Sequence, residues 1–345
     1  MIFHIKHQPN RKATAQHFLR KERRNAGSFR VSNVLKGMKK KLLALFLIFT
    51  LILPIFGCSP PPASTSSFRI TFIDVGQGDA ALIECDGHFM LIDGGDTYAA
   101  EAVDRVLTDR LSKANTTKLD FLVASHHHKD HIGGLIEGLD YVTEVDLTLS
   151  NVTSYDSKTF DKFNQRVLKL GSEITVPDIG ATYSLGSAKI QVIDTRNKKE
   201  NDSLVLLLSY GNTNFLFTGD VEEDAQKRVV DALRNSAIAD KLRSGKNLIK
   251  MPHHGAYNSD SFLPDNASDN YLYTLLDAYY AEYFVISVGE NNKYGHPHEN
   301  TLTVIGQALE VWERDPAKHL FRTDKNGDIV VESNGSEIII TPTKQ

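Results

Sequence analysis

The chain has 345 residues, of which 41% are hydrophobic and 24% are charged, so it is globular rather than disordered or fibrous. Its net charge of −4 is unevenly distributed, because the first 41 residues contain twelve Lys or Arg and one acidic residue. The remainder carries 27 basic against 42 acidic residues, a net charge of −15, which excludes a general electrostatic attraction for nucleic acid or anionic lipid. Two cysteines exclude a disulfide scaffold and a cysteine-rich zinc module.

The N-terminal region has the pattern of a secretory signal. Three lysines at 39–41 precede an uncharged apolar run of 15 residues, 42–56, followed by Gly57 and Cys58. The run is shorter than the ~20 residues that a membrane-spanning helix needs. Its end resembles a bacterial lipobox, in which Cys58 is lipidated; the alternative is a signal anchor that remains in the membrane. We therefore expect the protein at the outer face of a bacterial membrane, lipid-anchored or secreted.

The chain divides into four predicted segments. Residues 1–37 precede a possible start at Met38, and we expect them to be disordered or not translated. Residues 38–58 form the signal peptide, and the Pro/Ser-rich residues 59–67 form a tether. Residues 68–345 form one folded domain.

Within that domain, short β runs alternate with helical stretches. Strands are predicted, in chain order, at residues 68–74, 81–85, 89–93, 119–124, 145–149, 190–193, 204–209, 214–218, 247–251, 283–288, 320–323, 329–332 and 337–341. Helices are predicted at residues 98–111, 132–139, 221–233 and 301–312. This mixture predicts an α/β fold in which sheets pack on each other with helices outside.

A histidine-rich segment, SHHHKDH, directly follows one of the predicted strands. Because neighbours in an extended chain point to opposite sides, we expect His126 and His128 to bind one metal ion and His127 to point away. The turn that follows can bring Asp130 and His131 to a second ion. Imidazole and carboxylate together suit zinc, manganese or iron.

Two later strand ends carry further candidate ligands. Asp220 could bridge two metal ions, or it could open the next helix as a capping box with Glu223. His253 and His254 are adjacent after another strand, so at most one of them should be a ligand. We expect His253 to bind metal, and His254 to face substrate or to support a ligand.

Together these motifs resemble the metallo-β-lactamase fold and, more specifically, the soluble hydrolase domain of the competence protein ComEC. The matching segments are DVGQGDA at 74–80, LIDGG at 91–95, SHHHKDHIGG at 125–134, NDSLV at 201–205, FTGD at 217–220, HHG at 253–255, YGHP at 294–297 and RTD at 322–324. The resemblance implies a four-layer αββα sandwich with metals at the strand ends. The chain looks like a free-standing, membrane-tethered relative of that domain.

The resemblance also implies roles for other residues. It makes Asp93 a buried support of the histidine loop and places Gln77 and Asp79 near the site. The wider class supplies a third histidine to the first metal, and this chain has Asn-Asp-Ser at that place, so Asp202 or water would complete the site. Manganese is therefore as serious a candidate as zinc. The further possible site residues are Asp74, Gln77, Asp79, Asp93, Asn201, Asp202 and Ser203.

The expected function is metal-dependent hydrolysis. Two divalent ions, zinc or manganese, about 3.5–4 Å apart would activate a water molecule for attack on a phosphorus or carbonyl centre. Asp130 would orient the nucleophile, and His296 would protonate the leaving group or bind a phosphate oxygen. The resemblance implies a nuclease with DNA as its substrate, which basic residues at 198–199, 227–228 and 241–250 could contact. The alternatives are a small-molecule phosphoester or lactone hydrolase, and a non-catalytic surface lipoprotein that binds nucleic acid.

Overall fold

The computed structural model describes residues 67–257 and 271–344. These residues belong to one compact unit, Ser64–Gln345. The predicted signal peptide, Cys58 and all but the last residue of the tether lie outside the described residues, so the predicted segment boundaries stay predictions. Within the described ranges, no helix combines the length and the apolar character needed to cross a membrane.

The first sheet has, among the described residues, eight strands in the order β15-β14-β1-β2-β3-β4-β5-β6. The strands β3 to β6 are parallel, and the others pair antiparallel. Their bounds are β1 Phe68–Phe72, β2 Ala81–Cys85, β3 His88–Ile92, β4 Lys118–Ala124, β5 Glu144–Ser150, β6 Ile174–Thr175, β14 Ile329–Ser333 and β15 Ile338–Pro342.

The second sheet has seven strands in the described part of the chain, in the order β13-β12-β11-β10-β9-β8-β7. Strands β10 to β13 are parallel, so their carboxyl ends meet at one edge. Their bounds are β7 Thr182–Leu185, β8 Ala188–Asp194, β9 Val205–Tyr210, β10 Thr213–Phe217, β11 Lys246–Lys250, β12 Tyr283–Ile286 and β13 Leu320–Arg322. An apolar core lies between the two sheets; in it Phe68 stacks on Phe215 at 4.8 Å and Phe72 on Phe217 at 5.8 Å.

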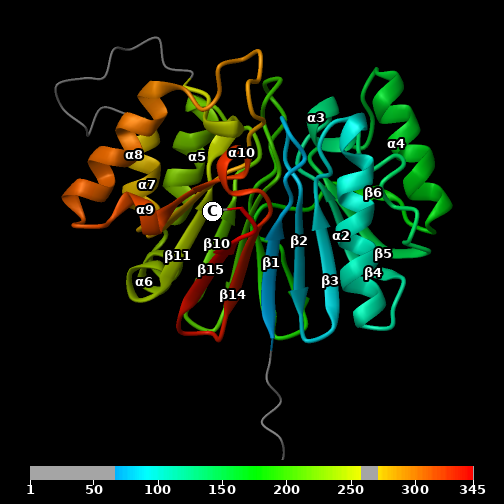
Figure 1. Ribbon diagram of the computed structural model, residues 1–345, viewed down its shortest axis with the longest axis horizontal. Coiled ribbons are helices and arrows are strands. Elements are labelled where there is room, and N and C mark those ends of the chain that lie inside the picture. The colour runs from blue at the N-terminus through cyan, green and yellow to red at the C-terminus, as the bar shows by residue number, and fades with distance from the viewer. Residues whose placement is uncertain (1–66, 258–270, 345) are drawn as a thin grey trace, which may run out of the picture. The chain divides into compact units, whose positions relative to one another are not determined.

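Helices cover the outer face of each sheet (Figure 1). Helices α2 (Ala100–Lys113) and α4 (Lys158–Lys169) pack on the first sheet, and α5 (Glu223–Leu233), α7 (Tyr271–Tyr279) and α8 (Glu299–Val311) pack on the second. This arrangement confirms the predicted four-layer αββα sandwich. The shorter elements are η1 Thr97–Ala99, α3 Lys129–Ile132, α6 Ser236–Ser244, η2 Pro252–Gly255, α9 Pro316–His319 and α10 Thr323–Asn326.

The helices differ from the predicted ones at several places. The helix predicted at 132–139 is instead α3, which ends at Ile132, because the Gly134 N–H donates to the Gly95 carbonyl at 2.9 Å rather than to the preceding turn. Helix α4 was not predicted, although its buried Phe160, Phe163 and Val167 have helical spacing. Helix α5 begins at Glu223 after an N-cap at Glu222 with no side-chain cap, so the proposed capping box of Asp220 and Glu223 is wrong.

Candidate metal centre

The ends of β4, β10 and β11 carry the chemically reactive segments. Because β10 and β11 are parallel neighbours, the segments that follow them lie side by side, and the His253 N–H donates to the Gly219 carbonyl at 3.0 Å. The segment after β4 joins them from the first sheet, since the Ser125 carbonyl accepts from Leu204 N–H at 2.7 Å. Residues far apart in the sequence therefore share one edge of the sandwich.

Two groups of potential metal ligands meet at this edge, with Asp220 between them. Asp220 Oδ1 lies 3.2 Å from His131 Nε2, and Asp220 Oδ2 lies 3.8 Å from His126 Nε2 and 3.5 Å from His254 Nε2. The first group is His126, His128 and Asp220, and the second is Asp130, His131 and His254. Within each group, the ligand atoms lie within 4.8 Å of one another. The carboxylate of Asp220 is thus placed to serve both groups.

The atoms that face the space between these groups are short of partners. Nε2 of His126, Nε2 of His131, Nε2 of His254 and Oδ1 of Asp220 are all buried and have no hydrogen-bond partner among the described residues. His131 Nε2 and Asp220 Oδ1 lie at ion-pair distance from each other, but none of the four atoms makes a well-aligned hydrogen bond, and a bound cation would supply the missing partner. Three imidazole nitrogens and a shared carboxylate fit divalent cations.

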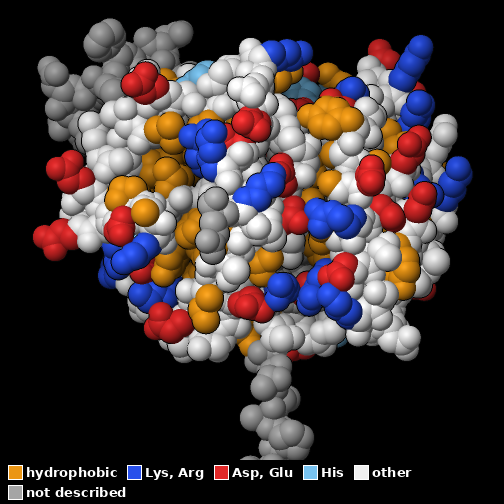
Figure 2. Space-filling model, in the orientation of Figure 1, with side chains coloured by type: hydrophobic (Ala, Val, Ile, Leu, Met, Phe, Trp, Pro, Cys, Tyr) orange, Lys and Arg blue, Asp and Glu red, His pale blue; other side chains and the backbone are white. Residues whose placement is uncertain are grey.

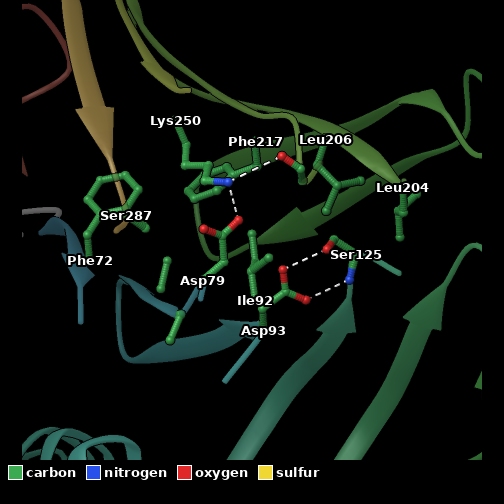
Figure 3. A pocket seen from close by; sticks show the side chains of 13 residues that line it. Phe72, Asp79, Ile92, Asp93, Ser125, Leu204, Leu206, Phe217, Lys250 and Ser287 are labelled. Carbon is green, nitrogen blue, oxygen red and sulfur yellow. Dashed lines mark hydrogen bonds and ion pairs between the residues drawn. The ribbon is translucent and has the colours of Figure 1, made fainter. Parts of the chain in front are cut away.

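The opposite nitrogens of two histidines fix which atom faces the cluster. His254 Nδ1 lies 3.0 Å from the Ser287 carbonyl oxygen, which can only accept, so Nδ1 carries a proton, and in the neutral ring the lone pair is on Nε2. His131 Nδ1 lies 2.9 Å from Asp93 Oδ2 in the same way. Asp93 also accepts from the Ser125 N–H and hydroxyl, both at 2.7 Å (Figure 3). Such outer partners orient metal-binding imidazoles.

The pKa shifts of the clustered side chains show that the buried carboxylates favour positive charge beside them. Burial opposes protonation of His254, but Asp220 and Asp79 outweigh it and raise its pKa to about 9. Burial likewise opposes protonation of His131, whose pKa Asp220 and Asp93 raise well above its usual value. The pKa of Asp220 is lowered despite its burial, because His131 and His254 lie beside it. Without metal, Asp220 therefore stays ionised, and His131 and His254 hold protons that a bound cation would displace.

The adjacent histidines differ in burial and in their contacts. Both have positive φ, 48° at His253 and 54° at His254, so the pair is not extended and strand alternation does not apply. His254 is fully buried and joins Asp130, with Nε2 3.4 Å from Oδ2. The side chain of His253 is 22% exposed, with Nε2 3.6 Å from Asp220 Oδ2, and its ring centroid lies 5.5 Å from that of His296. The geometry thus favours His254 as the ligand and His253 as a residue of the rim.

Asp202 does not reach the first metal group. Its carboxylate lies 2.7 Å from the Arg228 guanidinium and accepts the N–H groups of Lys198 and Lys199 at 2.8 and 3.1 Å, so the idea that Asp202 replaces the third histidine is wrong. Asn201 donates instead to Glu222 at 2.5 Å.

Ser203 occupies the position beside the first group. Its hydroxyl lies 3.5 Å from His126 Nδ1 and accepts the Asp220 N–H at 3.0 Å. The neighbouring Gly219 has φ of 54°, and a Cβ there would lie 2.6 Å from the Ser203 hydroxyl oxygen. Glycine is therefore required for Asp220 and Ser203 to approach each other. The Ser203 hydroxyl thus contacts both His126 and the backbone of Asp220.

Of the predicted residues Gln77 and Asp74, the first borders the cluster and the second does not. Gln77 Nε2 lies 3.4 Å from His296 Nδ1, while Gln77 Oε1 accepts the Gly289 N–H at 3.2 Å, so this loop does border the cluster. Asp74 belongs to none of the ligand groups found in the described residues; its carboxylate lies 3.0 Å from Lys344 Nζ.

Sequence reasoning missed Glu200 and misplaced Lys250. Glu200 Oε1 lies 3.0 Å from His128 Nε2 and accepts from the Tyr155 hydroxyl at 3.0 Å, and the Tyr155 ring stacks on His127 at 3.5 Å. No local pattern marks a contact across 72 residues. Lys250 was expected on the surface, but it is 3% exposed and paired with a buried aspartate (Figure 3).

The sequence profile of the metallo-β-lactamase superfamily matches residues 73–257. The chain belongs to this superfamily. It is 26% identical over 286 residues to ComE operon protein 3 of Bacillus subtilis (strain 168) and 25% identical over 268 residues to competence protein ComA of Neisseria gonorrhoeae. Both alignments cover 78% of this chain and 33% of the relative, so the chain spans about a third of the length of these relatives.

Among solved structures, the metallo-β-lactamase fold protein YhfI from Bacillus subtilis has a TM-score of 0.48 at 12% identity and covers 78% of this chain and 100% of its own. The sequence alignments with the two relatives confirm the predicted resemblance to the competence proteins. The superfamily and the ligand groups together indicate a metal-dependent hydrolase.

Proposed function

We propose that the protein is a two-metal phosphodiesterase that cleaves nucleic acid at the outer face of a bacterial membrane. The observation that carries the proposal is the convergence of four buried, unpartnered ligand atoms around the shared Asp220. Similarity to two competence proteins favours nucleic acid over other substrates.

The two ligand groups assign the residues that would hold each cation. His126 and His128 would hold the first and Asp130, His131 and His254 the second, with Asp220 shared. When bound, two divalent cations would lower the pKa of a water molecule and neutralise charge on a phosphodiester. The set combines four imidazoles with two carboxylates and so suits zinc, and manganese is the second candidate because the first cation would have only two imidazole ligands.

His296 and Asp130 would donate and accept hydrogen bonds at the partly exposed edge of the metal cluster. Burial and the neighbouring His253 and His254 lower the pKa of His296 to about 4, so its ring is neutral near pH 7. The Gln77 amide faces its Nδ1, which leaves Nε2–H to donate a hydrogen bond to a phosphate oxygen or leaving oxygen. Asp130, whose side chain is 29% exposed, would accept a hydrogen bond from the attacking water.

The face in Figure 2 shows no concentration of basic side chains that would attract a polyanion. Basic and acidic side chains alternate on the face in Figure 2. Two of the expected backbone contacts are already paired, Lys199 with Asp224 and Arg228 with Asp194. Nucleic acid would therefore be held mainly at the metal centre, and its binding should depend weakly on salt. The same observation favours the second candidate, hydrolysis of a small phosphoester or lactone.

The test uses the full chain purified in mild detergent, stripped of metal and reloaded with Mn²⁺ or Zn²⁺. It is assayed on a labelled single-stranded DNA oligonucleotide and on bis-p-nitrophenyl phosphate. We expect cleavage of both, at least 100-fold slower in Asp130→Asn and His254→Gln and unchanged in the exposed control Asp231→Asn. Cleavage of the small ester alone would favour the small-molecule hydrolase. Metal uptake with no cleavage of either substrate would leave only a binding protein.

Membrane attachment through Cys58 or a retained signal anchor is tested separately. We expect the expressed chain to fractionate with membranes and a Cys58→Ser variant to lose the attached lipid, measured by mass spectrometry of the intact protein. A wild-type mass without acyl groups would exclude lipidation.

A further inference from the structure

Three exposed tyrosines border the metal cluster. Among the described residues, five tyrosines are exposed, and three of them, Tyr98, Tyr155 and Tyr294, contact residues of the cluster or of its edge. These three are between 37% and 63% exposed, and they come from separate segments: η1, the loop between β5 and α4, and the loop between β12 and α8. Large aromatic side chains exposed together around one site are typical of a binding surface.

The Tyr155 ring lies beside the first ligand group. It stacks on the buried His127, with ring centroids 3.5 Å apart, and its hydroxyl donates to Glu200 Oε1 at 3.0 Å. The same Glu200 oxygen lies 3.0 Å from Nε2 of His128, a member of that group. One face of the Tyr155 ring is therefore covered and its hydroxyl is paired, so the part that it offers to a ligand is the other face of the ring.

The other two rings lie beside the second ligand group. The Tyr294 ring stacks on His296 with centroids 5.6 Å apart, and His296 in turn stacks on His254 at 6.3 Å. The Tyr98 hydroxyl donates to the Gln77 carbonyl at 3.0 Å, and Gln77 Nε2 lies 3.4 Å from His296 Nδ1. Exposed rings thus adjoin both ligand groups.

Aromatic rings beside a phosphodiester site fit nucleobases. Every base has a flat π face, so stacking on tyrosine holds a single strand without reading its sequence, whereas the bases of a duplex already stack on one another. Basic and acidic side chains alternate on the face in Figure 2, so stacking would replace affinity that phosphate contacts usually supply. Lys293 Nζ lies 4.9 Å from the centroid of the Tyr294 ring. A base that stacks there takes the place of this ammonium, which can then contact the next phosphate.

We propose that Tyr98, Tyr155 and Tyr294 form a stacking surface for the nucleobases of a single-stranded nucleic acid and so position its phosphodiester at the metal centre. The inference rests on the proposed two-metal function. A strand whose phosphate lies at Asp220 has bases on both sides of that phosphate, and rings adjoin both ligand groups. The preferred substrate is therefore a single strand, and a duplex must be opened before it is cleaved.

The experiment compares cleavage of a single-stranded DNA oligonucleotide and of an abasic strand of the same length by the Mn²⁺-loaded full chain. Both strands carry the same phosphates, so contacts with the N-terminal lysines and arginines contribute equally. We expect kcat/KM to be lower by about tenfold or more for the abasic strand and for a duplex. Replacing each of the three tyrosines by Leu should lower kcat/KM for the DNA strand by about 5–100-fold, and Phe, which keeps the ring, should stay within about threefold of wild type.

On the abasic strand the Leu variants should equal the wild type, because no base is present to stack. Tyr280→Leu is the matched control: Tyr280 is exposed, and its carbonyl accepts from Asn247 near the start of β11, at the opposite end of that strand from the cluster. Thermal unfolding and Mn²⁺ titration check that each variant folds and binds metal.

Equal losses on both strands in the Leu variants would show that the tyrosines only support the fold or the metals, and would overturn the inference alone. Equal cleavage of the base-containing and abasic strands by the wild type would do the same. Fluorescence anisotropy of the labelled strands in excess chelator measures binding without cleavage. Tighter binding of the base-containing strand by a chain that cleaves nothing when loaded with Mn²⁺ would support the stacking surface and overturn the proposed function.

Discussion

The Nδ1 atom of His131 lies 2.9 Å from Oδ2 of Asp93, and both side chains are buried. Asp93 follows β3, and His131 ends the histidine loop after β4. The contact turns the Nε2 atom of His131 towards Asp220, 3.2 Å away. Asp93, which is in neither of the two ligand groups around Asp220, therefore orients His131, which would bind the second cation.

Replacing Asp93 by Asn should weaken Mn²⁺ binding by about 10–100-fold, the usual effect of losing an outer partner of a metal-binding histidine. Asn offers one acceptor oxygen to three donors, the His131 ring and the two groups of Ser125. Calorimetric titration of the metal-free chain measures the change, with Asp231→Asn as the exposed control. An unchanged Kd would show that His131 needs no such support.

Ser203→Ala should lower the free energy of unfolding by about 1–3 kcal/mol, because the buried N–H of Asp220 loses its acceptor. Urea denaturation of the metal-free protein measures it. The exposed Ser112→Ala should have an effect below about 0.5 kcal/mol. Equal stability of the two variants would mean that the Asp220 N–H finds another acceptor.

Arg228→Met should destabilise the fold by about 3–5 kcal/mol, since it leaves the buried carboxylate of Asp202 without its cation and removes one of the two cations of Asp194. Arg228 lies 2.7 Å from both Asp194 and Asp202, each of which is buried. The measurement is the midpoint of denaturant unfolding. Recovery of most of the loss in Asp202→Asn/Arg228→Met would support this cause, whereas a loss under about 1 kcal/mol would contradict it.

The ion pairs of Asp194 and Asp202 with Arg228 should also make the free energy of unfolding fall in acid. Burial raises the pKa of Asp194, but hydrogen bonds from Arg228 and Arg196 outweigh it and lower the pKa below its ordinary value of 3.8. A group whose pKa is lower in the folded state stabilises it above the unfolded pKa, and this contribution is lost as the pH falls through the folded pKa. The unfolding free energy should therefore drop below about pH 4. Asp194→Asn should flatten that drop when unfolding is followed between pH 2 and 6, and an equally steep drop would rule out Asp194 as a source.

Glu200→Ala should raise the Kd for Mn²⁺ several-fold, because His128 loses the carboxylate 3.0 Å from its Nε2 and its ring becomes free to turn. Glu200→Gln keeps an acceptor oxygen and should stay within about twofold of wild type. Both values come from the same calorimetric titration. A loss in Gln as large as in Ala would point to the charge rather than the orientation of His128.

Much of the fold and part of the site could be predicted from the sequence. The histidine loop is a local pattern on a strand end, so its four metal-binding candidates could be named from spacing alone. His253 and His254 could not be distinguished, because the expected alternation assumes an extended chain and both residues have positive φ. The backbone conformation of such a turn is set by packing, not by the two side chains.

Long-range pairing accounts for the other differences. From its place in the sequence, Asp202 was expected to be a carboxylate available to the first metal. In the structure it forms an ion pair with Arg228, 26 residues later in the chain. Lys250 stood in a basic stretch typical of a surface, and only the approach of Asp79 from the other sheet makes it a buried cation. Glu200 lies in a polar loop without a motif. Such partners depend on the tertiary fold, which local sequence does not encode.

The most direct test of the central claim follows cleavage of a single-stranded DNA oligonucleotide by the full chain as Mn²⁺ is added, with bound metal measured in the same samples. The account predicts binding of two equivalents per chain and cleavage that rises as the second is bound. Cleavage that persists in excess chelator, or two bound equivalents without any cleavage, would contradict a two-metal phosphodiesterase.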